Sequence, residues 1–575
     1  MALSATEDAI DFHHNSCPFQ PARGPKEVWD AFDPSSRRFS DAGMNIEFNH
    51  DIPTRDGIKL RADIYLPQDI SEATKLPVVL AITPYGKQSP FDVSLIPESR
   101  EWDAGFNGVN FSKYTLFEGS DPHFWTQHGY AYVAVDSRGS FASEGDFLPF
   151  LSKLSGLDAY DVIEYMGTSV GWSNGRIGMI GASALGAVQW LAAEFQPPHL
   201  ACIMVQDALT DMYRDVAFKG GVLHKNFLEG LNQIYLAHGN AKGSLVTDVA
   251  TACERYPYYN EFWEQHTAGI ENIVCPVYVI TSFADNGVHT PGSIRGYLAA
   301  KSAQKFIELH PYLKWEWQLT AESLERQLAF FSKFLEGPDH RLAQSVDFWP
   351  PVRLHVTEKH YAGSWRSENE FPLARTQRVK YFLGKEGRLE GNSTKGSDAV
   401  TYSAKEGTVL WTKTFSKPTE FTGTGRLHLA FSISSGKDAD VFVTLQKRDR
   451  TGNIVHFPFH SFINDGHVAW GWISASKRKV ADHAYGDEVV YTFREQDVQP
   501  LQPNQKVELD IGIQPSATLF RKGETIQVVI QGRDFNDYSP SCQVGRAGTG
   551  CNEGEHTIFL EGSYVELPLI PQKFI

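Results

Sequence analysis

The sequence has no long apolar run and no feature of an export signal. Among its 575 residues, no stretch approaches the roughly 18 consecutive apolar residues that a transmembrane helix needs. Near the start, Glu7, Asp8 and Asp11 stand where a secretory signal would need a basic start followed by an apolar core. We therefore expect a cytoplasmic protein that does not contact the membrane.

Cysteine is scarce, and the patterns that bind metals are absent. The six cysteines form no C-x-x-C pair, which in an intracellular protein usually means free and mostly buried thiols. Cys542 and Cys551 are close enough in sequence to pair, so a single disulfide remains an alternative. There is no H-E-x-x-H motif, and the adjacent His13 and His14 cannot face one site from a regular element. We expect no cofactor and no metal.

Basic residues are fewer than acidic ones. The chain has 53 Lys and Arg against 69 Asp and Glu, a net charge of −16, and it contains no block of basic residues that could follow a phosphate backbone. Nucleic acid is therefore not an expected partner. The partner that we expect is a small-molecule substrate, neutral or cationic given the acidic surface, and the sequence leaves a homodimer open.

Three patterns follow one another along the chain. In residues 45–205 and 273–340, continuous apolar runs such as LPVVLAITPYG alternate with helix-like stretches such as SGLDAYDVIEYMG. This alternation is typical of a parallel sheet covered on both faces, which is the α/β class. Residues 206–272 interrupt it with several predicted helices, the usual position of a cap over a substrate pocket. Residues 345–575 contain short strand-like runs between turns, which predict an all-β jelly roll, and residues 1–44 form an N-terminal extension.

The stretch RIGMIGASALGAVQW, residues 176–190, places one serine between a predicted strand and a predicted helix. Small neighbours, among them Gly181 and Gly186, surround Ser183, as a nucleophile on a sharp strand-to-helix turn requires. Small residues also occur where a helix crosses a strand closely, so the pattern alone leaves a structural role open. It also departs from the general G-x-S-x-G motif, because Leu185 takes the position of the second glycine.

An acid and a base follow the serine in the order that an α/β-hydrolase uses. Asp285 comes just after the predicted strand CPVYVITS, and His310 ends the next one, KFIELH. Each has an alternative explanation. Asp285 begins a good turn sequence, His289 competes as the base, and His310 could stack on Trp315 or Trp317 instead. The three matches in order favour the triad of serine, aspartate and histidine.

Two further features bear on a pocket. Tyr85 follows an early predicted strand, where its hydroxyl could donate to an oxyanion or could order the loop after Pro84. The aromatic-rich segment REWDAGFNGVNFSKYTLFEGSDPHFW, residues 100–125, could line the pocket or pack as an exposed loop.

Taken together, these blocks resemble the serine hydrolase family that includes cocaine esterase, the α-amino acid ester hydrolases and the X-prolyl dipeptidyl peptidases. The resemblance runs from PTRDGIKLRADIYLP through TPYGK, HGYAYVAVDSRGSFASEGDF and FADNGVHTPGSIRGYL to SATLFRKGETIQVVIQGRD. It implies an α/β-hydrolase core with an inserted helical cap and a C-terminal jelly roll. By position it implies Ser183 as the nucleophile in G-x-S-x-x-G, Asp285 as the acid, His310 as the base, and Tyr85 with the backbone N–H of Ala184 as the oxyanion hole.

Two departures from the family pattern concern the substrate. Ala184 stands where the family commonly has tyrosine, which keeps the backbone donor but changes the pocket wall. His310 lies in ELHPYLKWEW and not in a G-P-W-x-H context. The resemblance therefore implies the fold and the triad but no particular substrate.

The function expected from the sequence is hydrolysis of an ester or amide bond in a small organic molecule, through an acyl-enzyme on Ser183. One alternative is an acyltransferase or cyclase that gives the same acyl group to an acceptor other than water. Another is an X-prolyl or amino-acyl peptidase, whose amine-recognising carboxylates would be Asp207, Asp211 and Asp215, although capping and turn roles suit these residues better. A third is a non-catalytic binding protein that uses the jelly roll.

Overall fold

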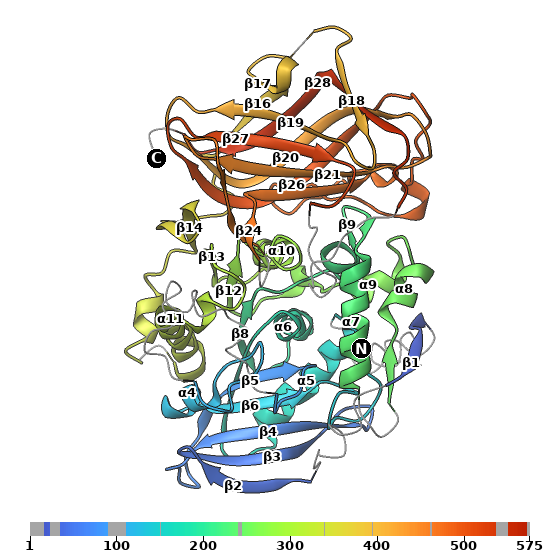
Figure 1. The fold of residues 1–575 in the computed structure, drawn as a ribbon. Coiled ribbons are helices and arrows are strands. Elements are labelled where there is room, and N and C mark those ends of the chain that lie inside the picture. The colour runs from blue at the N-terminus through green and yellow to red at the C-terminus, as the bar shows by residue number, and fades with distance from the viewer. Residues whose placement is uncertain are drawn as a thin grey trace.

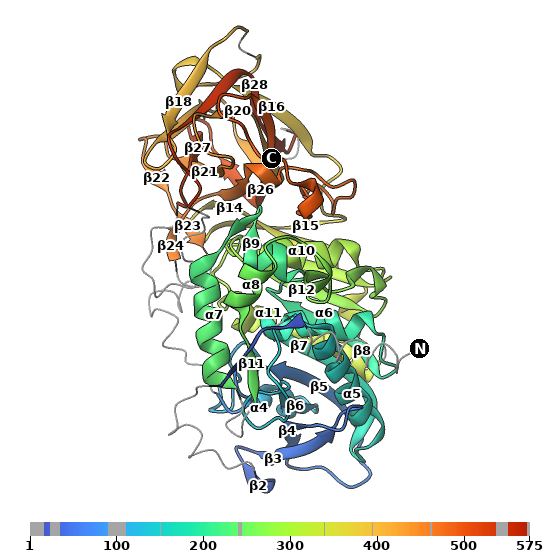
Figure 2. The same ribbon diagram turned by 90° about the vertical axis from the view of Figure 1, so that its right-hand side faces the viewer.

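The protein is described by a computed structural model, which places residues 16–22, 35–89, 111–149, 151–239, 244–337, 340–393, 395–459, 463–535 and 550–571. It has two stacked parts (Figure 1), a mixed α/β part that contains the N-terminal half and a strand-rich C-terminal part. The view turned by 90° (Figure 2) shows the same stacking, with β2 and β3 at the end of the α/β part farthest from the C-terminal strands.

One long sheet forms the centre of the α/β part. Its strands, in spatial order, are β2 (Arg37–Asp41), β3 (Met44–Pro53), β4 (Lys59–Pro67), β6 (Ala131–Asp136), β5 (Leu76–Thr83), β7 (Ser173–Ala182), β8 (Leu200–Gln206), β12 (Val277–Ser282), β13 (Lys305–His310), β14 (Val352–Lys359) and β15 (Ala362–Glu368). The strands from β6 to β14 pair in parallel, and the strands at both ends pair antiparallel. Every residue of β5, β6 and β12 is buried, as expected for parallel strands covered on both faces.

Helices cover this sheet: α4 (Pro122–Gln127), α5 (Lys153–Thr168), α6 (Ala184–Glu194), α10 (Thr290–Ala299), α11 (Ala321–Phe331) and α12 (Ala343–Val346). The helix after β13 packs on the sheet through an apolar stripe, because Leu324, Leu328, Phe331 and Leu335 recur at helical spacing and are all buried. The final turn is wound as a π-helix, and Gly337 ends it with φ at 124°, a backbone conformation that favours glycine.

The segment predicted as a helical cap contains short strands as well as helices. Its elements are the π-helical turn η2 (Met212–Ala217), β9 (Phe218–Lys219), β10 (Val222–Leu223), α7 (Lys225–His238), β11 (Leu245–Thr247), α8 (Val249–Arg255), α9 (Glu261–Glu264) and the 3₁₀ turn η3 (Ile270–Asn272). The N-terminal strand β1 (Phe19–Pro21) pairs with β11, so part of the N-terminal extension packs on this segment.

The C-terminal part is a sandwich of two antiparallel sheets. The first contains β16 (Gln377–Leu383), β17 (Leu389–Glu390), β18 (Ala399–Ser403), β20 (Thr419–Ile433), β26 (Val507–Phe520) and β28 (Glu555–Leu569). The second contains β19 (Thr408–Thr414), β21 (Asp440–Arg448), β22 (Ile454–Val455), β25 (Ala469–Ser474) and β27 (Thr525–Gln531), and β23 (Phe457–Phe459) pairs separately with β24 (Ile463–Gly466). Buried aromatic and aliphatic side chains such as Trp411, Phe421 and Ile511 fill the space between them.

The central sheet contains strands from outside the segments predicted for the α/β core. It begins at Arg37, inside the predicted extension 1–44, because β2 pairs with β3. After residue 345 it includes β14, which adds in parallel to β13, and β15, which pairs with β14. Strand β14 also pairs with β26 of the jelly roll, through Thr357 and Thr518. A strand's partners are set by the fold, and the sequence of β14 alone does not show which sheet it joins.

Three smaller points of the sequence analysis are the free thiols, the alternative disulfide and the lack of a membrane-spanning helix. Cys202 and Cys253 are buried free thiols, whereas Cys542 lies outside the described residues, so the alternative of a disulfide with Cys551 is not resolved. Within the described ranges, every helix is too short or too polar to span a bilayer.

Candidate active site

The turn between β7 and α6 carries Ser183 in a strained backbone conformation. Its φ of 56° and ψ of −117° are rare for a residue with a side chain, and such strain is typical of functional positions. The small neighbours are required for steric reasons. A Cβ atom at Gly181 would lie 2.4 Å from the Cβ of Leu185, and one at Gly186 would lie 2.6 Å from the Cβ of Ala208. The sequence prediction of a strand, a sharp turn and a helix is thus confirmed here.

Hydrogen bonds to neighbouring strands hold the turn in place. The Ser183 N–H donates to the carbonyl oxygen of Asp207 at 2.8 Å, and the Ala182 N–H donates to that of Glu118 at 2.7 Å. The Asp207 carboxylate in turn accepts the Ser282 N–H at 2.7 Å. Residues at the carboxyl ends of β8 and β12 therefore fix the backbone on which Ser183 is presented.

The side chain of Ser183 contacts a histidine, and that histidine contacts an aspartate. The Ser183 Oγ and the His289 Nε2 are 2.9 Å apart, and the His289 Nδ1 is 2.5 Å from the Asp285 Oδ2. Asp285 and His289 occupy one turn between β12 and α10, in which the His289 N–H donates to the Asp285 carbonyl at 3.1 Å. A base within reach of a hydroxyl and oriented by a carboxylate is the arrangement that activates a serine.

The structure does not place His310 beside Ser183, and this corrects the predicted base. His310 ends β13, as predicted, but its side chain is fully buried. Within the described ranges neither of its ring nitrogens has a hydrogen-bond partner, and its Nε2 is 3.9 Å from the Asp207 Oδ2. Burial lowers the pKa of His310 to about 3. Its ring contacts the Trp317 ring with centroids 6.3 Å apart, which agrees with the alternative of a histidine packed on tryptophan.

Both predicted oxyanion donors lie next to Ser183: Ala184 follows it in the chain, and Tyr85 lines the same cavity. Ala184 is the first residue of α6, and the first backbone N–H groups of a helix have no partner within it. Tyr85 lines the same cavity wall as Ser183 and Glu118. Burial raises the pKa of Tyr85 well above its ordinary value, so the phenol keeps its proton and can donate it.

A cavity of about 450 Å³ lies over this group. Ser183 and His289 form part of its wall together with Tyr85. The rest of the wall is largely apolar and comes from the cap, the loop before α4, the turn between β12 and α10, and the loop after β13: Phe117, Leu209, Val216, Phe227, Leu231, Ile234, Val288 and Trp315. The predicted pocket-lining role of the segment 100–125 applies to Phe117 and Glu118, whereas residues 100–110 lie outside the described ranges.

Comparison with known proteins decides the family. Residues 56–313 match the model of the X-Pro dipeptidyl-peptidase (S15 family), and residues 345–564 match that of the X-Pro dipeptidyl-peptidase C-terminal non-catalytic domain. The chain is 25% identical over 423 residues to the cocaine esterase of a Rhodococcus species, a match that covers 64% of this chain and 67% of that protein. The chain belongs to the cocaine esterase and X-Pro dipeptidyl-peptidase family of serine hydrolases. It is therefore an enzyme whose chemistry is the cleavage of ester or amide bonds.

Solved structures of this family support the fold. A CocE/NonD family hydrolase from Staphylococcus aureus superposes with a TM-score of 0.85 at 29% identity, covering 95% of this chain and 100% of that one. An α-amino acid ester hydrolase superposes with a TM-score of 0.68 at 18% identity, over 94% of this chain and 99% of that one. The predicted α/β-hydrolase core with a C-terminal jelly roll is thus confirmed.

The three aspartates considered as an amine-binding cluster have structural partners. Asp211 caps η2 by accepting the Arg214 N–H at 3.0 Å, and Asp215 accepts the Thr210 N–H at 2.9 Å. Asp207 accepts the Ser282 N–H, as described above. This agrees with the capping and turn roles that the sequence favoured.

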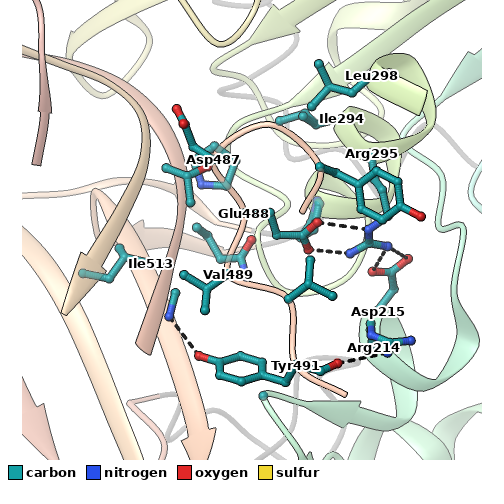
Figure 3. A pocket seen from close by; sticks show the side chains of 18 of the residues that line it. Arg214, Asp215, Ile294, Arg295, Leu298, Asp487, Glu488, Val489, Tyr491 and Ile513 are labelled. Atoms are coloured by element: carbon teal, nitrogen blue, oxygen red, sulfur yellow. Dashed lines mark hydrogen bonds and ion pairs between the residues drawn. The ribbon is translucent and has the colours of Figure 1, made fainter. Parts of the chain in front are cut away.

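A second, smaller cavity of about 90 Å³ lies between this serine hydrolase core and the jelly roll (Figure 3). Arg295 of α10 lies between two carboxylates there. Its Nη1 is 3.1 Å from the Asp215 Oδ1, and its Nη2 is 2.6 Å from the Glu488 Oε1. This ion pair network joins the helix that follows His289 to both the cap and the jelly roll.

Two charged residues of the active-site cavity were not identified from the sequence. Glu118 precedes α4, and Lys314 follows β13. The two side chains are buried and form an ion pair beside Tyr85. They are 196 residues apart, and nothing in either local sequence indicates that they meet. For Glu118 the available signal was its place in the segment 100–125, a possible pocket wall, and for Lys314 it was the place just after the predicted strand KFIELH.

Proposed function

We propose that this family member hydrolyses its substrate through an acyl-enzyme on Ser183, with His289 as the general base. The His289 Nε2 takes the proton of the Ser183 hydroxyl while the Oγ attacks the substrate carbonyl carbon. Asp285 holds the ring so that Nε2 faces the serine, and its charge stabilises the imidazolium that forms. The observation that carries this proposal is the unbroken hydrogen-bonded series from Ser183 through His289 to Asp285.

The oxyanion that develops on the carbonyl oxygen would accept hydrogen bonds from the Ala184 N–H and the Tyr85 hydroxyl. The His289 imidazolium then gives its proton to the leaving alcohol or amine as the carbon–oxygen or carbon–nitrogen bond breaks. A water molecule, deprotonated by the same His289, attacks the acyl-serine and releases the carboxylic acid. His289 is neutral again at the end of the cycle.

The substrate we propose is a small ester or amide with an apolar group beside the scissile bond. This rests on the volume of about 450 Å³ and on the aliphatic and aromatic side chains of the cap that form most of the wall. The carboxylates that an amino-acyl peptidase would need are engaged by backbone N–H groups, which makes hydrolysis of a neutral acyl group the better supported reading.

The test is labelling by a fluorophosphonate, which reacts with activated serines, followed by measurement of the intact protein mass. We expect one adduct on the wild type and none on Ser183→Ala. We also expect Ser183→Ala to lower ester turnover by about three to six orders of magnitude, since the serine, base and acid act as a unit. The matched control is Ser563→Ala, a buried serine of the jelly roll whose hydroxyl donates to the Phe559 carbonyl, and this variant should still be labelled. An adduct on Ser183→Ala would overturn the assignment.

A further inference from the structure

A buried carboxylate lies where the mechanism places negative charge. Glu118 is 3% exposed and lines the cavity with Ser183 and Tyr85. After burial, its negative charge is the next cause of the raised pKa of the Tyr85 phenol. A carboxylate at this position has two adverse effects on an oxyanion. It repels the developing charge, and it competes for the phenol proton that the oxyanion needs.

Two donors from the loop after β13 are directed at this carboxylate. Lys314, itself 4% exposed, forms an ion pair with the Glu118 Oε1. The Trp315 Nε1 lies 3.4 Å from the same oxygen, and the Lys314 Nζ lies 5.2 Å from the centroid of the Trp315 ring. The ammonium and the indole thus both face the Glu118 Oε1, and the charge of the lysine balances the charge of the carboxylate.

The same carboxylate cannot be displaced easily, because its residue is part of the scaffold of the nucleophile. The Glu118 carbonyl accepts the Ala182 N–H one residue before Ser183, and Glu118 has a φ of 56°. The side chain is therefore held next to the oxyanion site by its own backbone, and its charge must be balanced there.

We propose that Lys314 is a positioning residue for the hydrolysis described above. By neutralising Glu118, it weakens the attraction of that carboxylate for the Tyr85 proton, so that the phenol can donate to the oxyanion. This inference rests on the proposed function and adds to it a residue that does not touch the reacting atoms. The alternative role for a lysine in this wall is direct binding of a substrate carboxylate. If Lys314 acts by neutralising Glu118, changing Glu118 as well should restore kcat. If Lys314 binds the substrate, changing Glu118 should not restore it.

The experiment is a double-mutant cycle measured with an uncharged substrate, p-nitrophenyl butyrate. We expect Lys314→Met to lower kcat by about 100-fold while KM changes less than about threefold, because only the transition state needs the Tyr85 proton. We expect the double variant Glu118→Gln/Lys314→Met to recover kcat to within about tenfold of the wild type, since removal of the carboxylate removes the need for the lysine. In a Tyr85→Phe background, Lys314→Met should lower kcat by no more than about threefold.

Lys153→Met is the matched control, because it also breaks a lysine–glutamate pair, with Glu194 at 2.5 Å, but outside the active-site cavity. Its kcat should stay within about twofold of the wild type. A double variant as impaired as Lys314→Met, with a wild-type denaturation midpoint, would overturn the inference. If Lys314→Met does not fold, the neutral double variant carries the test alone, and a loss of more than about 100-fold in its kcat overturns the inference. Failure of the proposed function is distinguishable, because the wild type would then not be labelled at Ser183.

Discussion

At the scale of single residues, two histidines lie near the aspartate that follows β12, and only His289 is hydrogen-bonded to Ser183. His289 is joined to both Ser183 and Asp285 by hydrogen bonds. His310 is buried in an aromatic environment beside Trp317, and burial keeps it neutral by lowering its pKa to about 3. A histidine that cannot reach the hydroxyl and resists protonation is unsuited to general base catalysis.

The Tyr85 hydroxyl gives a prediction at the same scale. Tyr85→Phe removes one oxyanion donor and leaves the ring in its contact with Phe117, whose centroid is 5.2 Å away. We expect kcat to fall by about 10²- to 10³-fold with little change in KM, since the missing hydrogen bond is made mainly in the transition state. Steady-state kinetics with p-nitrophenyl butyrate measures this. An unchanged kcat would show that Tyr85 does not stabilise the oxyanion.

The residues that the sequence predicts well are those set by local rules. Ser183 could be found because a strained turn demands small neighbours, and Asp285 because it follows a strand end. The base was predicted to be His310, because a rule of chain order favours the end of the next strand. The bond that selects His289 depends on how one turn folds between β12 and α10. Glu118 and Lys314 were missed because only the fold brings their two loops together.

At the scale of elements, α10 couples the active site to the rest of the molecule. His289 is the residue directly before this helix, and Arg295 on the helix bridges Asp215 of the cap and Glu488 of the jelly roll. Ser293 on the same helix donates to the Ala208 carbonyl at 3.0 Å. The helix is thus held from three directions, which fixes the position of the histidine.

Removing the Arg295 guanidinium should therefore lower the free energy of unfolding. Arg295→Met leaves the buried Asp215 and the partly exposed Glu488 without their cation, so we expect the free energy of unfolding to fall by about 3 to 5 kcal/mol. The control is Arg494→Met, which breaks an exposed pair with Glu264 in the same region and should cost less than about 1 kcal/mol. Urea denaturation measures both. Equal losses in the two variants would contradict a structural role for the buried network.

The elements themselves were predicted more securely than their partners. The apolar runs of β5, β7 and β12 indicate buried strands by their short length and composition, and the stripe of α11 indicates a helix by its periodicity. The assignment of β14 and β15 to the central sheet, and of short strands to the cap, could not be predicted, because pairing depends on contacts between distant segments. Periodicity reports which face of an element is buried but not what covers it.

At the scale of the whole molecule, stability should depend on buried histidines that stay neutral. Burial lowers the pKa of each of five histidines, to about 3 for His310 and about 4 for His266, His355, His467 and His556. Below a pH of about 6.5 the unfolded chain binds protons at these groups and the folded chain does not. Each group therefore removes stability as the pH falls from about 6.5 toward its folded pKa.

His266 offers a direct test of this dependence. It is 2% exposed, and its Nδ1 lies 2.7 Å from the Phe262 carbonyl. The loss of unfolding free energy between pH 7 and pH 5 should be smaller in His266→Gln than in the wild type by about 2 kcal/mol. Denaturant unfolding of both proteins at the two pH values measures the difference. Parallel losses would mean that His266 has the same pKa in the folded and unfolded states.

The measurement that tests the account most directly compares His289→Ala with His310→Gln. The account predicts that His289→Ala lowers kcat/KM for p-nitrophenyl butyrate by at least about 10³-fold, whereas His310→Gln stays within about tenfold of the wild type. Near-wild-type activity of His289→Ala, with a large loss in a correctly folded His310→Gln, would contradict the assignment of His289 as the base of Ser183.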